Sequence, residues 1–201
     1  LSSHQASYVL MSVMTAISGA PGSVGACLAY RLELSPDWKA RITEELKRAG
    51  FEALCEAPAK VAPDTYRFLR EILRLYSFPM VSHRRATRDL KLEPAYVAED
   101  EFYHLSSFFT HRDPEHWADA EAFDPNRWAK GCPAPARGAY VPFGWAERTC
   151  TGAAIGTSQL ALLAWLLTQE FRIEVSDDAR PWWREEGFLI PADFRGRLKR
   201  F

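Results

Sequence analysis

The sequence predicts a mainly α-helical chain with a minor β component, organised as a single partial domain over residues 1–201. Long stretches carry apolar residues at helical spacing, short runs between turn-forming residues are typical of small strands, and no repeat or low-complexity linker divides the chain. Aromatic residues make up 13% of the composition, which excludes a disordered chain. The formal net charge of −1 leaves no basic excess to neutralise phosphates, so we expect no nucleic-acid partner.

The first predicted element is a long helix over about residues 1–33. Residues 5–30 include no charged side chain. Because serine and glycine interrupt the apolar sequence, we expect a buried helix kinked at Pro21 rather than a membrane span. A chain that begins inside such a helix, with no visible signal peptide, is expected to be a fragment or the second half of a longer protein.

Start and stop signals divide the rest of the chain. Ser35-Pro36 opens a charged amphipathic helix that ends at Gly50, and Pro63-Asp64 opens another helix. The leucines that follow residue 152 are spaced for one apolar face. The later predicted elements are a helix over about 64–75, small strands over about 81–103, an irregular Pro- and Trp-rich region over about 110–151, a helix over about 152–170 and tail strands over about 171–201.

Four cysteines are spread widely along the chain and form no Cys-x-x-Cys pair: Cys27, Cys55, Cys132 and Cys150. In a chain of this length, that spacing argues against a disulfide framework and against a zinc site. Each cysteine is therefore interpreted singly, and only one of them has neighbours that indicate chemistry.

That cysteine is Cys150, which directly precedes the helix expected from residue 152. Amides at a helix start favour a thiolate over a thiol. Gly144 and Gly152 let the backbone approach a flat ligand or the sulfur itself, and Arg148 supplies a cation suited to a carboxylate. A lone cysteine at a helix start is more often a packing residue, so the surrounding pattern has to decide.

The loop over residues 143–152 resembles the cysteine-ligand loop of the cytochrome P450 family, Phe-x-x-Gly-x-Arg-x-Cys-x-Gly. Phe143, Arg148, Cys150 and Gly152 match this pattern, and Ala146 stands where the family has its middle glycine. Further segments resemble family motifs in the same order along the chain: Glu71-Ile72-Leu73-Arg74, Arg84-Arg85-Ala86-Thr87-Arg88-Asp89, His111-Arg112-Asp113-Pro114 and Phe123-Asp124-Pro125-Asn126-Arg127-Trp128. Together these motifs imply the C-terminal, haem-binding half of the P450 fold.

The resemblance assigns a role to each matching residue. Cys150 is implied as the axial thiolate ligand of the iron of haem b, a ligand that pushes electron density toward the metal. Glu71, Arg74 and Arg127 are implied as a buried charge cluster that holds the ligand loop, a structural role. The remaining cofactor-binding residues implied are Arg148, Arg84 (or Arg85 with a shift of one residue), Phe143, Gly152 and His111, the last with a loop-capping role as its alternative.

On the oxygen side, the long first helix is implied to cross the distal face of the haem. The family's acid–Thr pair aligns with Pro21 and Gly22, so Ser23 is the candidate for the proton relay. Three interpretations stay open. Ser23 and ordered water replace the pair, the substrate supplies the proton, or the chemistry is not ordinary oxygen activation.

The substrate side is implied to be apolar. Met80, Val81, Phe188 and Leu189 are the candidates for the pocket, with core packing as the alternative for each.

The function implied is a haem-thiolate monooxygenase of a hydrophobic small molecule, using O2 and electrons from a separate ferredoxin- or flavoprotein-type donor. The alternatives are a peroxide-using or rearranging enzyme, and a non-catalytic subunit that needs another chain or a missing N-terminal half. A bacterial cytoplasmic location is slightly favoured, with a membrane anchor in a preceding region as the alternative.

Overall fold

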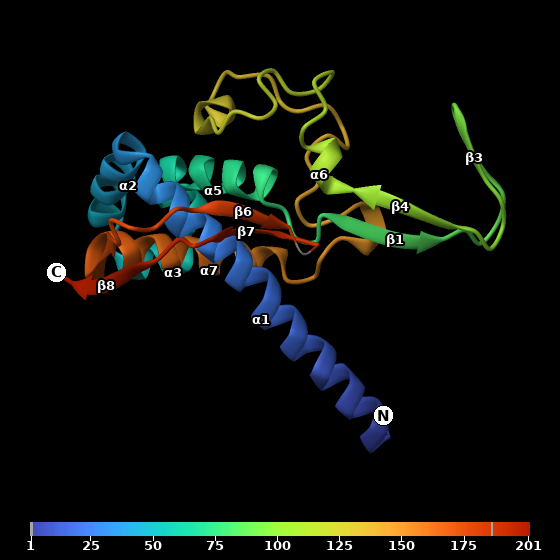
Figure 1. Ribbon diagram of the computed structural model, residues 1–201, viewed down its shortest axis with the longest axis horizontal. Coiled ribbons are helices and arrows are strands. Elements are labelled where there is room, and N and C mark those ends of the chain that lie inside the picture. Colours follow the sequence, from blue (N-terminus) through green and yellow to red (C-terminus); the bar gives the residue numbers. More distant parts are fainter. Residues whose placement is uncertain (1, 186) are drawn as a thin grey trace.

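Helices form the body of the molecule, and a β-hairpin arm projects from it (Figure 1). The computed structural model describes residues 2–185 and 187–201. The helices that pack against one another are α1 (Ser3–Leu34), α2 (Pro36–Ala49), α5 (Pro63–Leu75) and α7 (Ala153–Trp165). Their apolar faces enclose the main core, which includes Leu28, Ile42, Phe68 and Ile72, all fully buried.

The helix starts follow the sequence signals. Pro36 and Pro63 each occupy the first turn of their helix, where a missing N–H costs nothing. Gly50 ends α2 with a φ of 76°, a conformation that glycine adopts without strain. Two short helices that we did not predict, α3 (Phe51–Glu56) and α4 (Pro58–Val61), connect α2 to α5.

Helix α1 is buried only in its C-terminal half. Val24, Cys27, Leu28 and Leu32 lie in the core, whereas the apolar side chains of the N-terminal half are exposed. The prediction of a buried helix is therefore wrong for residues 3–19. The helix continues through Pro21 without interruption. By length and composition α1 could cross a membrane, with 17% of its most apolar window buried.

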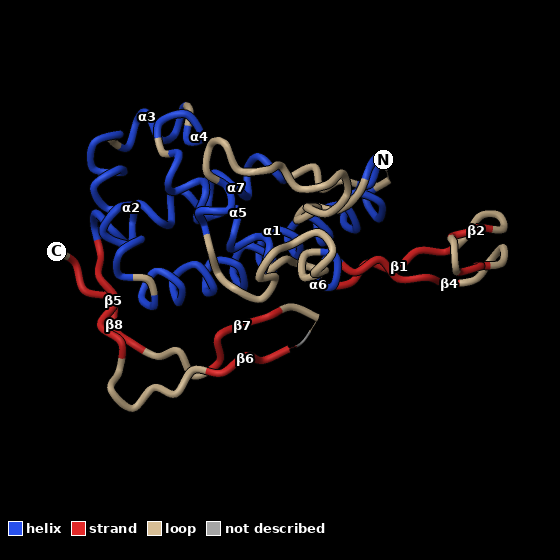
Figure 2. Tube along the Cα trace, turned by 90° about the horizontal axis from the view of Figure 1, so that it is seen from above, coloured by secondary structure: helices blue, strands red, loops and turns tan. Residues whose placement is uncertain are grey.

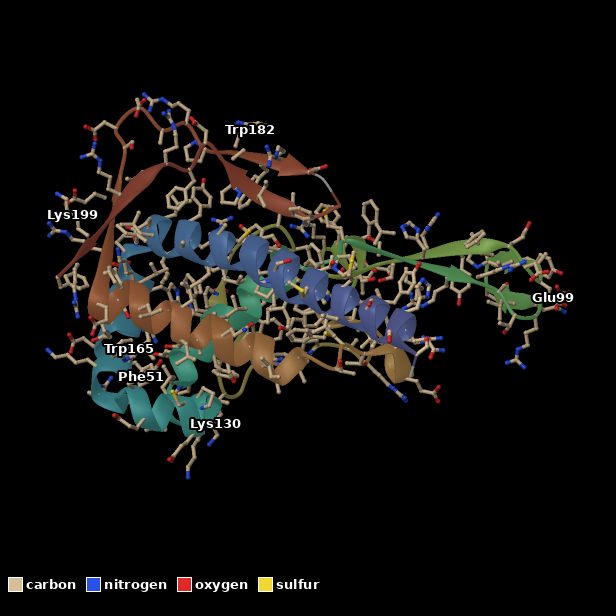
Figure 3. All side chains as sticks on the ribbon, turned by 90° about the horizontal axis from the view of Figure 1, so that it is seen from below. Phe51, Glu99, Lys130, Trp165, Trp182 and Lys199 are labelled. Carbon is tan, nitrogen blue, oxygen red and sulfur yellow. The ribbon has the colours of Figure 1, made fainter. Side chains whose placement is uncertain are left out.

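The arm is built from two antiparallel strand pairs. Strand β1 (Val81–Arg85) pairs with β4 (Phe102–Ser106), and β2 (Leu90–Leu92) pairs with β3 (Ala95–Val97). Figure 2 shows that this arm extends away from the helices, and Figure 3 places Glu99 at its far end. Helix α6 (Ser107–Thr110) returns the chain to the body.

The tail strands form two further antiparallel pairs. Strand β5 (Phe171–Val175) pairs with β8 (Gly196–Arg200), and β6 (Trp182–Glu185) pairs with β7 (Leu189–Ala192), which packs on α1. The helix predicted over about 152–170 ends earlier as an α-helix. Its last turn widens into the π-helical segment η3 (Leu166–Glu170). Figure 3 shows Phe51 beside Trp165, where their rings, with centroids 5.1 Å apart, join α3 to α7.

The irregular region between α6 and α7 contains two short 3-10 turns, η1 (Pro125–Trp128) and η2 (Ala146–Arg148). A small second core of Trp117, Trp128 and Ala139 supports this region.

Candidate functional site

Glu71 on α5 is the centre of a buried charge cluster that joins α5 to the irregular region. Arg74 donates from Nε to Oε2 at 3.0 Å and from Nη2 to Oε1 at 2.8 Å. Arg127 on η1 donates from Nε to Oε1 at 3.0 Å. The amide of Asp124 and the indole of Trp128 donate to the same carboxylate at 3.0 and 2.9 Å. The three residues predicted as a cluster therefore lie together, and Glu71 and Arg74 are completely buried.

Arg74 also binds the backbone of the irregular region. Its Nη1 donates to the carbonyls of His111 and Ala120 at 2.7 and 2.6 Å, and its Nη2 donates to the carbonyl of Ala122 at 2.8 Å. A guanidinium presents five N–H groups in a rigid plane. One side chain on α5 thus fixes three separate carbonyls of a segment that has little regular structure of its own.

His111 lies in the interior with both ring nitrogens bonded. The amide of Val141 donates to Nε2 at 2.8 Å, so Nδ1 carries the proton and donates to the carbonyl of Arg74 at 2.8 Å. Burial lowers the pKa of His111 to about 4, which keeps the ring neutral. Neither nitrogen is free for a haem propionate. The assignment of His111 to the cofactor does not fit this geometry, which favours the loop-capping role.

An aromatic cluster that we did not predict packs beside His111. Tyr140 packs on Trp128 with ring centroids 4.7 Å apart, and the guanidinium of Arg70 lies 3.8 Å from the centre of the Trp128 ring. The Tyr140 hydroxyl donates to the Arg70 carbonyl at 3.2 Å, and burial raises the pKa of Tyr140. The Trp and Tyr content of the irregular region was the available signal, but it does not specify which rings meet.

The loop around Cys150 is closed by its own backbone. The amide of Cys150 donates to the carbonyl of Phe143 at 2.7 Å. The Phe143 side chain packs on the main core, whereas Cys150 is exposed with a free thiol. Gly152 precedes α7, and a Cβ added there would lie 3.7 Å from the Cys150 sulfur. The loop therefore presents the thiol outward while its other end is anchored.

Two residues of this loop have a positive φ. Gly144 has a φ of 92°, and a Cβ there would lie 3.4 Å from the carbonyl oxygen of Arg148. Ala146 has a φ of 47°, in the left-handed region where a side chain is strained. Ala146 is the position at which the family motif has glycine, so the backbone keeps the conformation that the motif residue would favour.

The two arginines implied as propionate partners, Arg148 and Arg84, form no ion pair within the described residues. Arg148 is exposed and forms no ion pair with any residue of the described ranges. On the arm, Arg85 pairs with Asp100 at 3.1 Å, whereas the one partner of Arg84 among the described residues is the carbonyl of the adjacent His83, to which it donates at 2.8 Å. This difference favours Arg84 over Arg85 as the residue available for an anionic ligand.

Helix α1 packs against α7. At Gly25 an added Cβ would lie 3.0 Å from the side chain of Leu163, so the two helices approach closely there. Ser23, one half-turn earlier, is nearly buried, and its hydroxyl donates to the carbonyl of Ala20 at 3.1 Å. Pro21 has no amide hydrogen, so the carbonyl of Ile17 lacks its usual helical donor.

The start of β1 and the turn before β7 lie side by side next to α1. The amide of Met80 donates to the carbonyl of Gly187 at 3.1 Å. The rings of Phe78 and Phe188 have centroids 5.2 Å apart, and a Cβ at Gly19 would lie 3.8 Å from Phe78. The structure therefore brings Met80 and Phe188 to the same region of α1, as expected for residues that approach one pocket.

The other two pocket candidates lie differently. Val81 is exposed at 37%. Leu189 is buried in the main core, where its carbonyl accepts a hydrogen bond from the Cys27 thiol at 3.4 Å, so core packing rather than a pocket role describes it. Residues 186–190 are the tail turn that the resemblance implies near the substrate, and Glu186 lies outside the described residues.

A cavity of about 360 Å³ lies between α5, α7 and the ligand loop. Phe143, Gly144, Tyr140 and Thr157 are among its lining residues, and Cys150 is not. Thr149, the residue before Cys150, also lines it, so this cavity borders the ligand loop.

Comparison with known proteins agrees with this geometry. The family model described as Cytochrome P450 matches residues 24–193. Cytochrome P450 714C3 of Oryza sativa subsp. japonica is 33% identical over 175 residues, which cover 80% of this chain and 33% of the relative. The mouse mitochondrial 25-hydroxyvitamin D-1 alpha hydroxylase is 28% identical over 156 residues, 76% of this chain and 31% of that protein.

Among solved structures, retinoic acid bound cyanobacterial CYP120A1 superposes with a TM-score of 0.84 at 22% identity, covering 95% of this chain and 45% of that one. The chain thus spans about a third of the length of the curated relatives it matches. The family match extends over most of the chain, including the charge cluster and the cysteine loop. The chain belongs to the cytochrome P450 family.

Proposed function

We propose that this chain supplies the haem-thiolate half of a monooxygenase that acts on a hydrophobic small molecule. Oxygen is the co-substrate, and a separate ferredoxin- or flavoprotein-type donor supplies the electrons. The observation that carries the proposal is the Cys150 loop. Its thiol is exposed and free, and its backbone amide is bonded to the carbonyl of Phe143. The charge cluster that the family resemblance implies is also formed.

The residues of the loop fit haem b. Cys150 offers a free sulfur ligand, and glycine at 144 and 152 keeps the nearby backbone without side chains. Arg148 and Arg84 have guanidinium groups available for propionate carboxylates. Bound haem with a thiolate ligand supplies the activation of dioxygen.

The charge cluster acts as a support and not as a chemical participant. Glu71 and Arg74 fix the irregular region to α5, and His111 ties the same region to Val141, two residues before Phe143. Through these contacts the rigid helix sets the position from which the ligand loop starts. The expected consequence of breaking the cluster is a displaced loop and weakened haem retention.

On the distal side, we infer that Ser23 and water take the place of the family's acid–Thr pair. The carbonyl of Ile17, which receives no i+4 amide from Pro21, provides an acceptor for such a water, and the Ser23 hydroxyl lies further along the same helix. The hydroxyl now donates to Ala20, so it has to rotate before it can donate a proton to another group.

The exposed N-terminal half of α1 indicates a contact with a further part of the P450 fold. The N-terminal half of α1 exposes an apolar surface to which Tyr8, Leu10, Met11, Met14 and Ile17 contribute. Exposed apolar patches of this kind usually contact another protein segment. We therefore propose that the working enzyme also contains the remaining part of the P450 fold, from the same chain or another.

The bacterial cytoplasmic location expected from the sequence has no support among the relatives. Two of them are named as a mitochondrial protein of mouse and a chloroplastic protein of Arabidopsis thaliana.

Turnover with labelled oxygen tests the proposal. Lauric acid and a steroid are incubated as probes with the protein assembled with the remaining part of the P450 fold, ¹⁸O2, and a ferredoxin with its reductase. We expect one labelled oxygen atom per product, dependent on the electron donor and lost in Cys150→Ser but retained in Cys132→Ser. Product formation with hydrogen peroxide alone would instead indicate the peroxide-using alternative. Absence of product and of bound haem would favour the non-catalytic subunit.

A further inference from the structure

Two histidines face each other across the arm and have no part in the site described above. His83 on β1 and His104 on β4 are directly paired in the antiparallel register. Their Nδ1 atoms lie 2.7 Å apart, and their ring centroids are 4.7 Å apart. Both side chains are exposed. Among the described residues, neither ring is buried in the core or bonded to a carboxylate that would explain the pairing.

The pair occupies the opposite face of the hairpin from Arg84. Exposure alternates along β1, with His83 and Arg85 exposed and Ser82 and Arg84 half-buried. Arg85, the next exposed residue of β1 on the face of the pair, is neutralised by its ion pair with Asp100 at 3.1 Å. The face that presents the two imidazoles therefore carries little uncompensated positive charge to repel a cation.

We propose that His83 and His104 form a two-imidazole chelate for a divalent transition-metal ion such as Ni²⁺, Cu²⁺ or Zn²⁺. Imidazole nitrogen is a preferred ligand of these ions. With metal–nitrogen bonds of about 2.0 Å, two ligand nitrogens lie about 2.8 Å apart in a square-planar site and about 3.3 Å apart in a tetrahedral one. The present separation of 2.7 Å needs only a small rotation of the exposed rings to reach either value.

Metal binding requires a lone pair on both Nδ1 atoms. In the metal-free pair one ring donates its Nδ1 proton to the other, so that ring has to change tautomer and carry its proton on Nε2. Both rings are exposed, so the Nε2–H can bond to water. The described residues contain no group of three or more metal-ligating side chains, and water completes the coordination. The site is therefore exchangeable and separate from the haem thiolate.

Calorimetric titration of the protein with Ni²⁺ tests this assignment. His83→Ala and His104→Ala each leave one imidazole, so the loss of chelation lowers affinity about tenfold or more. The matched control is His116→Ala, which removes an exposed histidine of the irregular region and leaves affinity unchanged. The exposed cysteines Cys55, Cys132 and Cys150 are common to all variants, so any binding to them cancels in the comparison.

Folding is checked independently. Circular dichroism of each variant establishes that the hairpin substitutions leave the helical body intact. Wild type is also expected to gain thermal stability with Ni²⁺, a gain that both arm variants lose, because the metal binds the paired strands and not the unfolded chain. Equal affinities in wild type and either arm variant, or an equal loss in His116→Ala, would overturn the proposal.

Discussion

Glu71→Gln removes the charge at the centre of the buried cluster while keeping the size of the side chain. Oε1 of Glu71 accepts from Arg74, Arg127 and the amide of Asp124, and Oε2 accepts from Arg74 and the indole of Trp128. The NH2 group of glutamine, placed at either oxygen position, would face only hydrogen-bond donors and could bond to none of them. At least two of the five hydrogen bonds are lost, and the completely buried Arg74 keeps its charge without a counter-ion.

The expected cost is about 3–5 kcal/mol in the free energy of unfolding, the range for breaking a buried ion pair. For a domain of this size that corresponds to a decrease in Tm of about 6–20 °C. Urea denaturation followed by circular dichroism measures the change. Glu147→Gln is the matched control, because it makes the same change at an exposed residue of η2, within the ligand loop.

A loss smaller than about 1 kcal/mol, the value of an exposed ion pair, would refute this reasoning. It would show that the donors around Glu71 rearrange without strain and that the cluster does not hold the irregular region in place.

Three further predictions concern single residues. Ala146→Gly relieves the left-handed backbone and stabilises the protein by about 1 kcal/mol, measured by urea denaturation; an unchanged midpoint contradicts it. Between pH 6.5 and 4 the unfolded chain protonates His111 and the folded chain does not. As the pH is lowered through this range, the free energy of unfolding therefore decreases by about 3 kcal/mol more than in His111→Gln. Equal pH profiles of the two proteins would contradict this role of burial. Ser23→Ala lowers the coupling of electrons to product, and unchanged coupling excludes Ser23 from the relay.

The sequence was sufficient for the features that depend on local signals or on matched motifs. Pro36 and Pro63 open their helices because proline at the first turn loses no hydrogen bond. Glu71, Arg74 and Arg127 were grouped by resemblance, and the structure brings them together although Arg127 is 56 positions from Glu71. The π-helical turn after Trp165 has no comparable local signal, so one continuous helix was expected.

The features that the sequence left open or predicted wrongly depend on which way a side chain faces. Motif spacing places His111 near the ligand loop, but only the packing of Val141 and Arg74 shows that both ring nitrogens are used. Leu189 alternates with its neighbours along β7, and sequence does not decide which face meets α1. The exposure of the N-terminal half of α1 depends on what surrounds the helix, which periodicity cannot report.

The structure also shows pairings that no motif indicated. His83 and His104 become neighbours through the register of a hairpin whose strands are separated by a long connection. Trp128 joins the charge cluster through its indole nitrogen, a contact that depends on the path of η1. Contacts of this kind depend on tertiary geometry and cannot be predicted from residue patterns along the chain.

The most direct test of the account is the absorbance spectrum of the protein, reduced and exposed to carbon monoxide, compared with Cys150→Ser and Cys132→Ser. Cys132 is a second exposed thiol in the irregular region and serves as the matched control. We expect a strongly red-shifted Soret band, typical of thiolate-ligated haem, in wild type and in Cys132→Ser. The band is expected to be lost in Cys150→Ser. The same band in Cys150→Ser, or no thiolate-type band in wild type, would contradict it.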